Sequence, residues 1–175
     1  MDTMRTAPHP ADGVLDARTA ARSMPRLART DVRPDLPTRE ARLKWVIVVD
    51  QELPAGLAAN AAVCLGAAAG RALPEVVGPG GPDASGSHHP GLPWTGCAIL
   101  AADQATVRAI RERAAAKAEL HLVAMPALAQ ESRVYDGYLA ALAATPEPEL
   151  RYYGLSLIGA RNKVDKLVGR LPLLR

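Results

Sequence analysis

Apolar positions after residue 42 follow two alternating patterns. Nearly continuous apolar runs occupy 43–50, 96–102, 119–126 and 150–159. Runs without polar alternation are typical of strands that are covered on both faces of an α/β sheet. We therefore expect at least four core strands, with a further short strand at 74–78.

Segments with helical spacing lie between and after these runs, at 53–72, 104–118, 127–145 and 160–169. Asp103 is placed to cap the second helix, and Gly169 is placed to end the fourth. The stretch 78–93 is rich in glycine, proline and serine, so we expect a long irregular loop there, and the last five residues predict a short extended tail. The alternation predicts an α/β fold, a compact sandwich with at least four strands.

The first 38 residues lack both patterns. They are rich in Pro, Arg, Asp, Ala and Thr and show no sustained period. Such a segment cannot bury enough apolar area to offset its ordering entropy, so we expect a disordered tail at 1–38 that is dispensable for stability. Residues 39–175 then form a single α/β domain.

The amino-acid composition bears on how this domain packs and on the compartment in which we expect it. The apolar share of 49% comes mostly from Ala, Leu and Val, and the chain has no Phe, which favours close packing of helices on the sheet. Cys64 and Cys97 are far apart in the sequence and suit buried free thiols in a reducing compartment, with no structural metal. Because no segment is long and apolar enough for a signal peptide or a membrane span, we expect a cytoplasmic protein with no membrane partner.

The net charge of +3 is unevenly placed. Residues 1–44 hold nine Arg and Lys against six Asp and Glu, whereas residues 45–175 hold twelve of each sign. Within the folded part, 151–175 holds six basic residues and one acid, Asp165. This stretch suits a solvated face, and it leaves RNA binding as a weakly supported alternative.

The junction between the first strand and the first helix is the main candidate site. Open α/β sheets usually hold ligands where a strand ends and a helix begins, here between Asp50 and Asn60, with Gly56 between them. The carboxylates of Asp50 and Glu52 disfavour a phosphate and favour a polar neutral or amine-bearing small molecule. Alternatively, Asn60 is structural, with its amide buried and hydrogen-bonded to the loop backbone.

Other polar residues are weaker candidates. His88 and His89 are adjacent on the long loop and can bind metal or move protons, but no further ligands are evident, and exposed loop histidines are the simpler interpretation. Tyr135 can lie at the mouth of a pocket, although aromatic residues at helical spacing are more often core. Lys166 and Asp165 can form an ordinary surface ion pair.

Two stretches carry a resemblance to a known family. The opening KWVIVVDQELPAGLAANAA and the ending GLSLIGARNKVDKLVGRLPLL resemble type II peptidyl-tRNA hydrolases. The whole chain is similar, more closely, to a bacterial family of unknown function assigned to that fold, in which the opening motif and a Tyr-Asp-x-Tyr helix recur. The resemblance implies the type II peptidyl-tRNA hydrolase-like fold, a compact three-layer sandwich around a mixed sheet of at least four strands. Lys166 is of interest because it lies in the shared VDKLVG motif.

The departures from the hydrolases concern their catalytic positions. Gly56 stands where the resemblance places a catalytic lysine, and Asn60 stands where it places a glutamine. The expected Asp-x-x-x-Thr-Gln stretch reads AMPALAQES, with Met125 in place of the acid. Without a cation and an acid, electrostatic catalysis of ester cleavage loses its main contributors.

We therefore expect a small-molecule-binding or regulatory protein of this fold that uses no cofactor. The alternative is a hydrolase of unassigned substrate, including residual peptidyl-tRNA hydrolase-like activity, in which His88 or His89 acts with Asp50. The sequence does not decide whether the protein is an enzyme, and it leaves a homodimer open.

Overall fold

A mixed four-stranded sheet forms the centre of the domain. The computed structural model describes residues 27–175. The sheet has the order β4-β1-β6-β5, built from β4 (Ala98–Ala102), β1 (Leu43–Asp50), β6 (Tyr152–Ala160) and β5 (His121–Pro126). β1 pairs with β4 in parallel, and β6 runs antiparallel to both β1 and β5. The predicted mixed sheet is confirmed.

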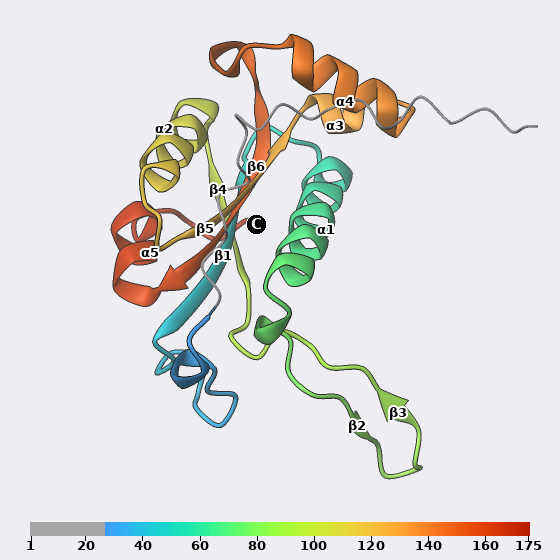
Figure 1. The fold of residues 1–175 in the computed structure, drawn as a ribbon, viewed down its shortest axis with the longest axis vertical. Helices are drawn as coiled ribbons and strands as arrows, with labels where there is room; N and C mark the ends of the chain where they lie inside the picture. Colours follow the sequence, from blue (N-terminus) through green and yellow to red (C-terminus); the bar gives the residue numbers. More distant parts are fainter. Residues whose placement is uncertain (1–26) are drawn as a thin grey trace, which may run out of the picture.

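Helices cover both faces of this sheet (Figure 1). α1 (Ala55–Ala72) packs on one face, while α2 (Gln104–Ala115) and α5 (Arg161–Val168) pack on the other. Two short helices, α3 (Leu128–Glu131) and α4 (Tyr135–Ala144), lie together beyond one end of the sheet. The predicted three-layer arrangement is therefore confirmed, with α3 and α4 added at its end.

The two faces of the sheet bury separate apolar clusters. Val46, Val48, Leu155 and Leu157 face α2 and α5, and each is fully buried. On the α1 face, the small side chains of Ala58, Ala61 and Ala69 let the helix approach the sheet closely, with Leu65 as its one large buried residue. The buried pair of Trp45 and Ser156 is satisfied, because the indole Nε1 donates to Ser156 Oγ at 2.9 Å.

Three segments differ from the sequence-based expectation. The predicted strand at 74–78 is wrong: Pro74–Val76 form a 3-10 turn, since proline fits the first position of a helical turn, where its missing N–H is not needed. The predicted helix at 127–145 is broken into α3 and α4, because Ser132 and Val134 have extended backbone angles. The expected irregular loop contains a hairpin of β2 (Gly81–Pro82) and β3 (His88–His89).

The helix ends follow the sequence more closely. Asp103 caps α2 as predicted, accepting from the Thr106 backbone N–H at 2.7 Å. Gly169 follows the last residue of α5, but its φ of −63° is right-handed, so glycine's freedom to adopt positive φ is not used there.

Both ends of the described chain contact the domain. The extended C-terminal tail runs along the edge strand β4, with hydrogen bonds from Ala101 N–H to Pro172 O and from Leu174 N–H to Ile99 O, each 3.0 Å. Most of the segment predicted to be disordered, 1–38, lies outside the described residues. Within its described part, Leu27 packs against the apolar cluster at the end of α1, and Arg161 donates to the backbone oxygen of Thr38. Among the helices of residues 27–175, none combines the length and the apolar character that a membrane span needs.

Candidate functional site

Asp50 ends β1 with its side chain fully buried and hydrogen-bonded within the scaffold. Its Oδ2 accepts from Arg151 Nη2 and from Gln104 Nε2, each at 2.7 Å, and its Oδ1 accepts from the Glu52 backbone N–H at 3.0 Å. Burial acts to raise the pKa of Asp50, but the hydrogen bonds from Arg151, Glu52 and Gln104 outweigh it and hold the pKa below its ordinary value. The carboxylate therefore joins the end of β1 to α2 and to Arg151, the residue just before β6.

Asn60 lies on the exposed face of α1, whereas the sequence predicts it to be buried. Its side chain is exposed, and its Oδ1 accepts from Gln130 Nε2 and from Cys64 Sγ, the latter at 3.5 Å. Among the hydrogen bonds of residues 27–175, none joins the Asn60 amide to the 50–56 backbone. The prediction of a buried amide that secures that loop is wrong, and Asp50 and Asn60 do not form one site. Gly56, between them, is exposed, with open space where a side chain would project.

Asn60 instead belongs to a cavity of about 650 Å³ between α1, β5 and the α3–α4 pair, which we call the α1–β5 cavity. Small and apolar side chains form most of its wall, and polar groups from α1 and the α3–α4 pair complete it. Its lining residues are Asn60, Cys64, Leu65, Ala67, Ala68, Val123, Ala124, Met125, Pro126, Ala129, Ser132, Arg133, Tyr135 and Tyr138. This volume suits a drug-sized molecule, for which pockets are typically about 300–1,000 Å³.

The polar groups of the α1–β5 cavity come from residues spread over 79 positions of sequence, from Asn60 to Tyr138. Tyr135 is exposed, and its ring meets that of Tyr138 edge to face with centroids 5.6 Å apart. Burial raises the pKa of the Tyr138 phenol, so it stays protonated and able to donate near neutral pH. Arg133 contributes a cation from the break between α3 and α4, where its side chain is exposed.

The remaining candidates lie elsewhere. His88 and His89 are exposed on the β2–β3 hairpin, which projects from the end of the molecule opposite α3 and α4 (Figure 1). His89 Nε2 lies 3.1 Å from Asp83 Oδ2 on the same hairpin. Because Asp50 ends β1 at the other end of the sheet, the proposed pairing of a histidine with Asp50 is wrong. Within residues 27–175, no three His, Cys, Asp or Glu side chains converge as a metal site requires.

Lys166 is exposed on α5, and the predicted pair with Asp165 is wrong because Asp165 forms its ion pair with Lys44. Several basic groups of 151–175 are also engaged: Arg151 with Asp50, Lys163 with Glu119, and Arg161 with backbone oxygens of Thr38 and Ala41. RNA binding by this stretch stays a prediction.

Sequence reasoning found Asn60 and Tyr135 but gave no role to Gln130 or Arg133. Gln130 follows the strand run by four residues, in the AMPALAQES stretch, and Arg133 follows it by seven. The position of a polar residue just after a buried strand was the available signal, because strand ends and the loops after them often form ligand sites.

These features define an α/β/α protein with a mainly apolar cavity beside α1. A family model described as "Protein of unknown function (DUF2000)" matches residues 43–175, so the chain belongs to this family. A comparison with curated proteins gives no match. Among solved structures, a protein of unknown function, Atu0240 from Agrobacterium tumefaciens strain C58, is similar, with a TM-score of 0.69 and 17% sequence identity over 75% of this chain and 97% of that chain. At this identity the likeness concerns the fold alone.

Proposed function

We propose that this chain binds a small, mainly apolar molecule in the α1–β5 cavity and does not hydrolyse it. The observation that carries the proposal is the cavity itself: a wall of alanine, leucine, valine and methionine, with an amide, a phenol and a guanidinium beside it. Such a combination fixes the orientation of a ligand through a few polar contacts and gains affinity from apolar burial. The site thus differs from the Asp50–Asn60 junction that the sequence favours.

We further propose the type II peptidyl-tRNA hydrolase-like fold for the domain. In support, Asn60 and Met125 are positions that the resemblance matches to hydrolase site residues. Both residues line the α1–β5 cavity, and Gln130 of the AMPALAQES stretch donates to the Asn60 amide oxygen.

The same positions argue against the hydrolytic alternative. Gly56 offers no cation, and Met125 offers no carboxylate to organise a water molecule. Asn60 and Gln130 are joined by one hydrogen bond, from Gln130 Nε2 to Asn60 Oδ1, and carry no charge. Neither amide can take up a proton near neutral pH, so general base catalysis has no agent at these positions.

A fluorescent probe with an apolar body and one anionic group, 1-anilinonaphthalene-8-sulfonate, tests the binding proposal. We expect saturable binding at micromolar concentrations, because the naphthalene suits the apolar wall and the sulfonate suits Arg133. Bound probe should also slow alkylation of the exposed Cys64 by N-ethylmaleimide several-fold, since Cys64 lines the cavity. Mass spectrometry of the native protein can then search for a co-purified molecule at the same site.

The variant Ala68→Phe fills the cavity from α1, and Ala59→Phe is its matched control. Both alanines are exposed on the same helix, but Ala68 lines the cavity and Ala59 does not. We expect Ala68→Phe to weaken probe binding at least ten-fold and Ala59→Phe to leave it unchanged. Equal affinity in both variants, or probe binding that leaves Cys64 unprotected, would contradict the proposal. Release of the acyl group from an N-acetylated aminoacyl-tRNA above the rate in buffer would favour the hydrolase instead.

A further inference from the structure

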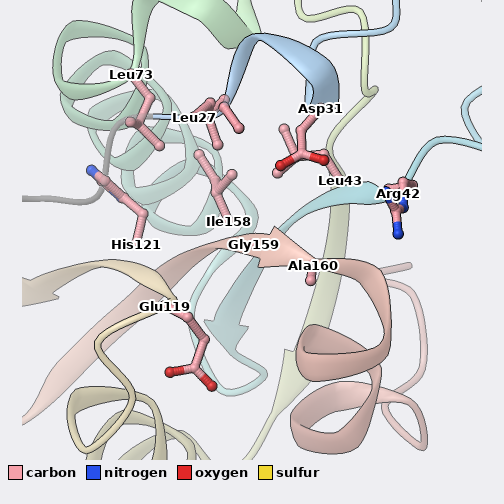
Figure 2. A pocket seen from close by; sticks show the side chains of 11 residues that line it. Leu27, Asp31, Arg42, Leu43, Leu73, Glu119, His121, Ile158, Gly159 and Ala160 are labelled. Atoms are coloured by element: carbon pink, nitrogen blue, oxygen red, sulfur yellow. The ribbon is translucent and has the colours of Figure 1, made fainter.

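A second cavity lies at the other end of β5, where the first described residues cross the end of the sheet (Figure 2). Its volume is about 490 Å³. Its wall is formed by Leu27, Ala28, Asp31, Arg42, Leu43, Leu73, Glu119, His121, Ile158, Gly159 and Ala160. We call it the His121 cavity, and it shares no lining residue with the α1–β5 cavity.

His121 is the unusual residue of this cavity. Its side chain is buried, at 2% exposure, and neither ring nitrogen has a hydrogen-bond partner, which is true of no other buried side-chain polar atom in residues 27–175. In Figure 2 the imidazole extends to the side of the sheet on which Leu73 lies, whereas the carboxylate of Glu119 extends the other way. Leaving a buried polar group unpaired destabilises a fold, so an unpartnered imidazole that lines a cavity is best explained by a ligand that completes it.

The surroundings of His121 define the chemistry of that ligand. Leu27, Leu43, Leu73 and Ile158 make the cavity wall around the ring apolar. Burial lowers the pKa of His121, so the ring is neutral at pH 7, with one N–H donor and one nitrogen acceptor. The cavity also has two carboxylates, Asp31 and Glu119, and one guanidinium, Arg42. These charges of both signs give little preference for an anion, whereas a hydroxyl group can donate to one imidazole and an apolar body can fill the remaining space.

We propose that the His121 cavity binds an uncharged small molecule with a compact apolar body and one hydroxyl group, which hydrogen-bonds to the imidazole of His121. The partner is thus an alcohol or a phenol rather than an acid, an amine or a metal ion. This site is independent of the α1–β5 cavity.

Phenol and toluene provide a matched pair of probes for the full-length protein, because they share a ring and differ in the hydroxyl. NMR of the histidine ring protons should show His121 shifting with phenol in a saturable way, while the exposed His88 and His89 stay constant. Toluene should bind at least ten-fold more weakly, because it leaves the imidazole unpaired. Benzoate and benzylamine should produce no saturable shift.

The variant His121→Leu keeps an apolar side chain of similar size, and His88→Leu is the control on the exposed hairpin. We expect His121→Leu to lose the preference for phenol over toluene and to melt no lower than the unaltered protein, since no hydrogen bond is removed. His88→Leu should keep the preference. A clear fall in the melting temperature of His121→Leu would assign a structural role and overturn the proposal.

The unaltered protein also gives a decisive result without any variant. Absence of a saturable His121 shift with phenol, or equal affinity for phenol and toluene, would overturn the proposal. The outcome is separable from the proposed function, because phenol bound at His121 should leave the alkylation rate of Cys64 unchanged, and Ala68→Phe should leave phenol binding unchanged.

Discussion

Asp50 is the residue whose role changes most between sequence and structure. Its place at the end of a buried strand suggests a ligand site, yet its carboxylate is fully buried and accepts hydrogen bonds from three groups of the chain. A carboxylate held in this way stabilises the contact between three elements. Its removal should therefore be measured as a loss of stability.

We expect Asp50→Asn to lower the free energy of unfolding by about 1.5–3 kcal/mol at pH 7, the range for hydrogen bonds to a charged group. The pKa of Asp50 is below its ordinary value in the fold, so the stability it contributes is fully present above the unfolded pKa, about 4, and is lost as the pH falls through the folded pKa. Urea denaturation of both proteins from pH 7 down to pH 3 should show the difference shrinking below pH 4.

Glu52→Gln is the control for this change, because the Glu52 side chain is exposed and its backbone N–H to Asp50 is kept. It should leave stability at pH 7 nearly unchanged. A difference between Asp50→Asn and the unaltered protein that stays constant down to pH 3 would show that the ionised carboxylate is not the stabilising form.

The two cysteines should differ sharply in reactivity. Cys64 is exposed, whereas burial raises the pKa of the Cys97 thiol to about 12, and the thiolate is the form that reacts. At pH 8 we expect one equivalent of N-ethylmaleimide to react quickly, with the second reacting only after denaturation, as followed by intact-protein mass spectrometry. The variant Cys64→Ser should remove the fast equivalent. Fast labelling that persists in Cys64→Ser would place the reactive thiol at Cys97.

At the scale of elements, the strands were easier to predict than the orientation of α1. The run at 43–50 becomes β1 with the same bounds, because a continuous β-branched stretch fits a strand covered on both faces. The sequence favours burial of Asn60 and Cys64, but the buried residues of α1 are Ala58, Ala61, Leu65 and Ala69. An alanine-rich helix offers several stripes of similar apolarity, so its rotation is decided by tertiary packing, which a single sequence does not reveal.

Helix α4 lacks the buried face that its sequence suggests. None of its residues is buried, and Tyr135 and Leu139 are largely exposed, as is Val134 just before it. Its regular leucine and tyrosine spacing predicted a core helix, and the turn at Ser132–Val134 places it beyond the sheet instead. The periodicity of this segment can be recognised in the sequence, but the turn that sets the position of α4 cannot.

This exposure predicts that α4 opens more readily than α1. Helices with few buried apolar contacts unfold locally at low free energy, and their amides then exchange with solvent. Hydrogen exchange followed by mass spectrometry should show the amides of 135–144 exchanging faster than those of 55–72. Bound 1-anilinonaphthalene-8-sulfonate should slow exchange at 135–144, because Tyr135 and Tyr138 line the α1–β5 cavity. Equal protection of the two helices without probe would contradict this expectation.

At the scale of the molecule, the two cavities lie at opposite ends of β5. The α1–β5 cavity lies where β5 ends, and the His121 cavity lies where β5 begins. The first could be approached from the sequence, because the resemblance points to Asn60 and to the AMPALAQES stretch. The second could not, because it depends on Leu27 and Asp31 crossing the sheet end, in a segment without any periodic pattern.

That crossing alters what we expect of the N-terminal segment. The sequence alone predicts no loss of stability on removing residues 1–38, but Leu27 packs against the cluster of Leu43, Leu73 and Ile158, and Thr38 accepts from Arg161. A chain that begins at Arg39 loses both contacts, whereas a matched chain that begins at Leu27 keeps them. Partial burial of one leucine contributes about 1–2 kcal/mol, so the shorter chain should melt about 2–8 °C lower than the longer one. Differential scanning calorimetry measures this directly. Identical melting of the two chains would show that the crossing segment adds no stability. Phenol affinity in the shorter chain, which lacks Leu27, would then show whether the His121 cavity needs that wall to bind phenol.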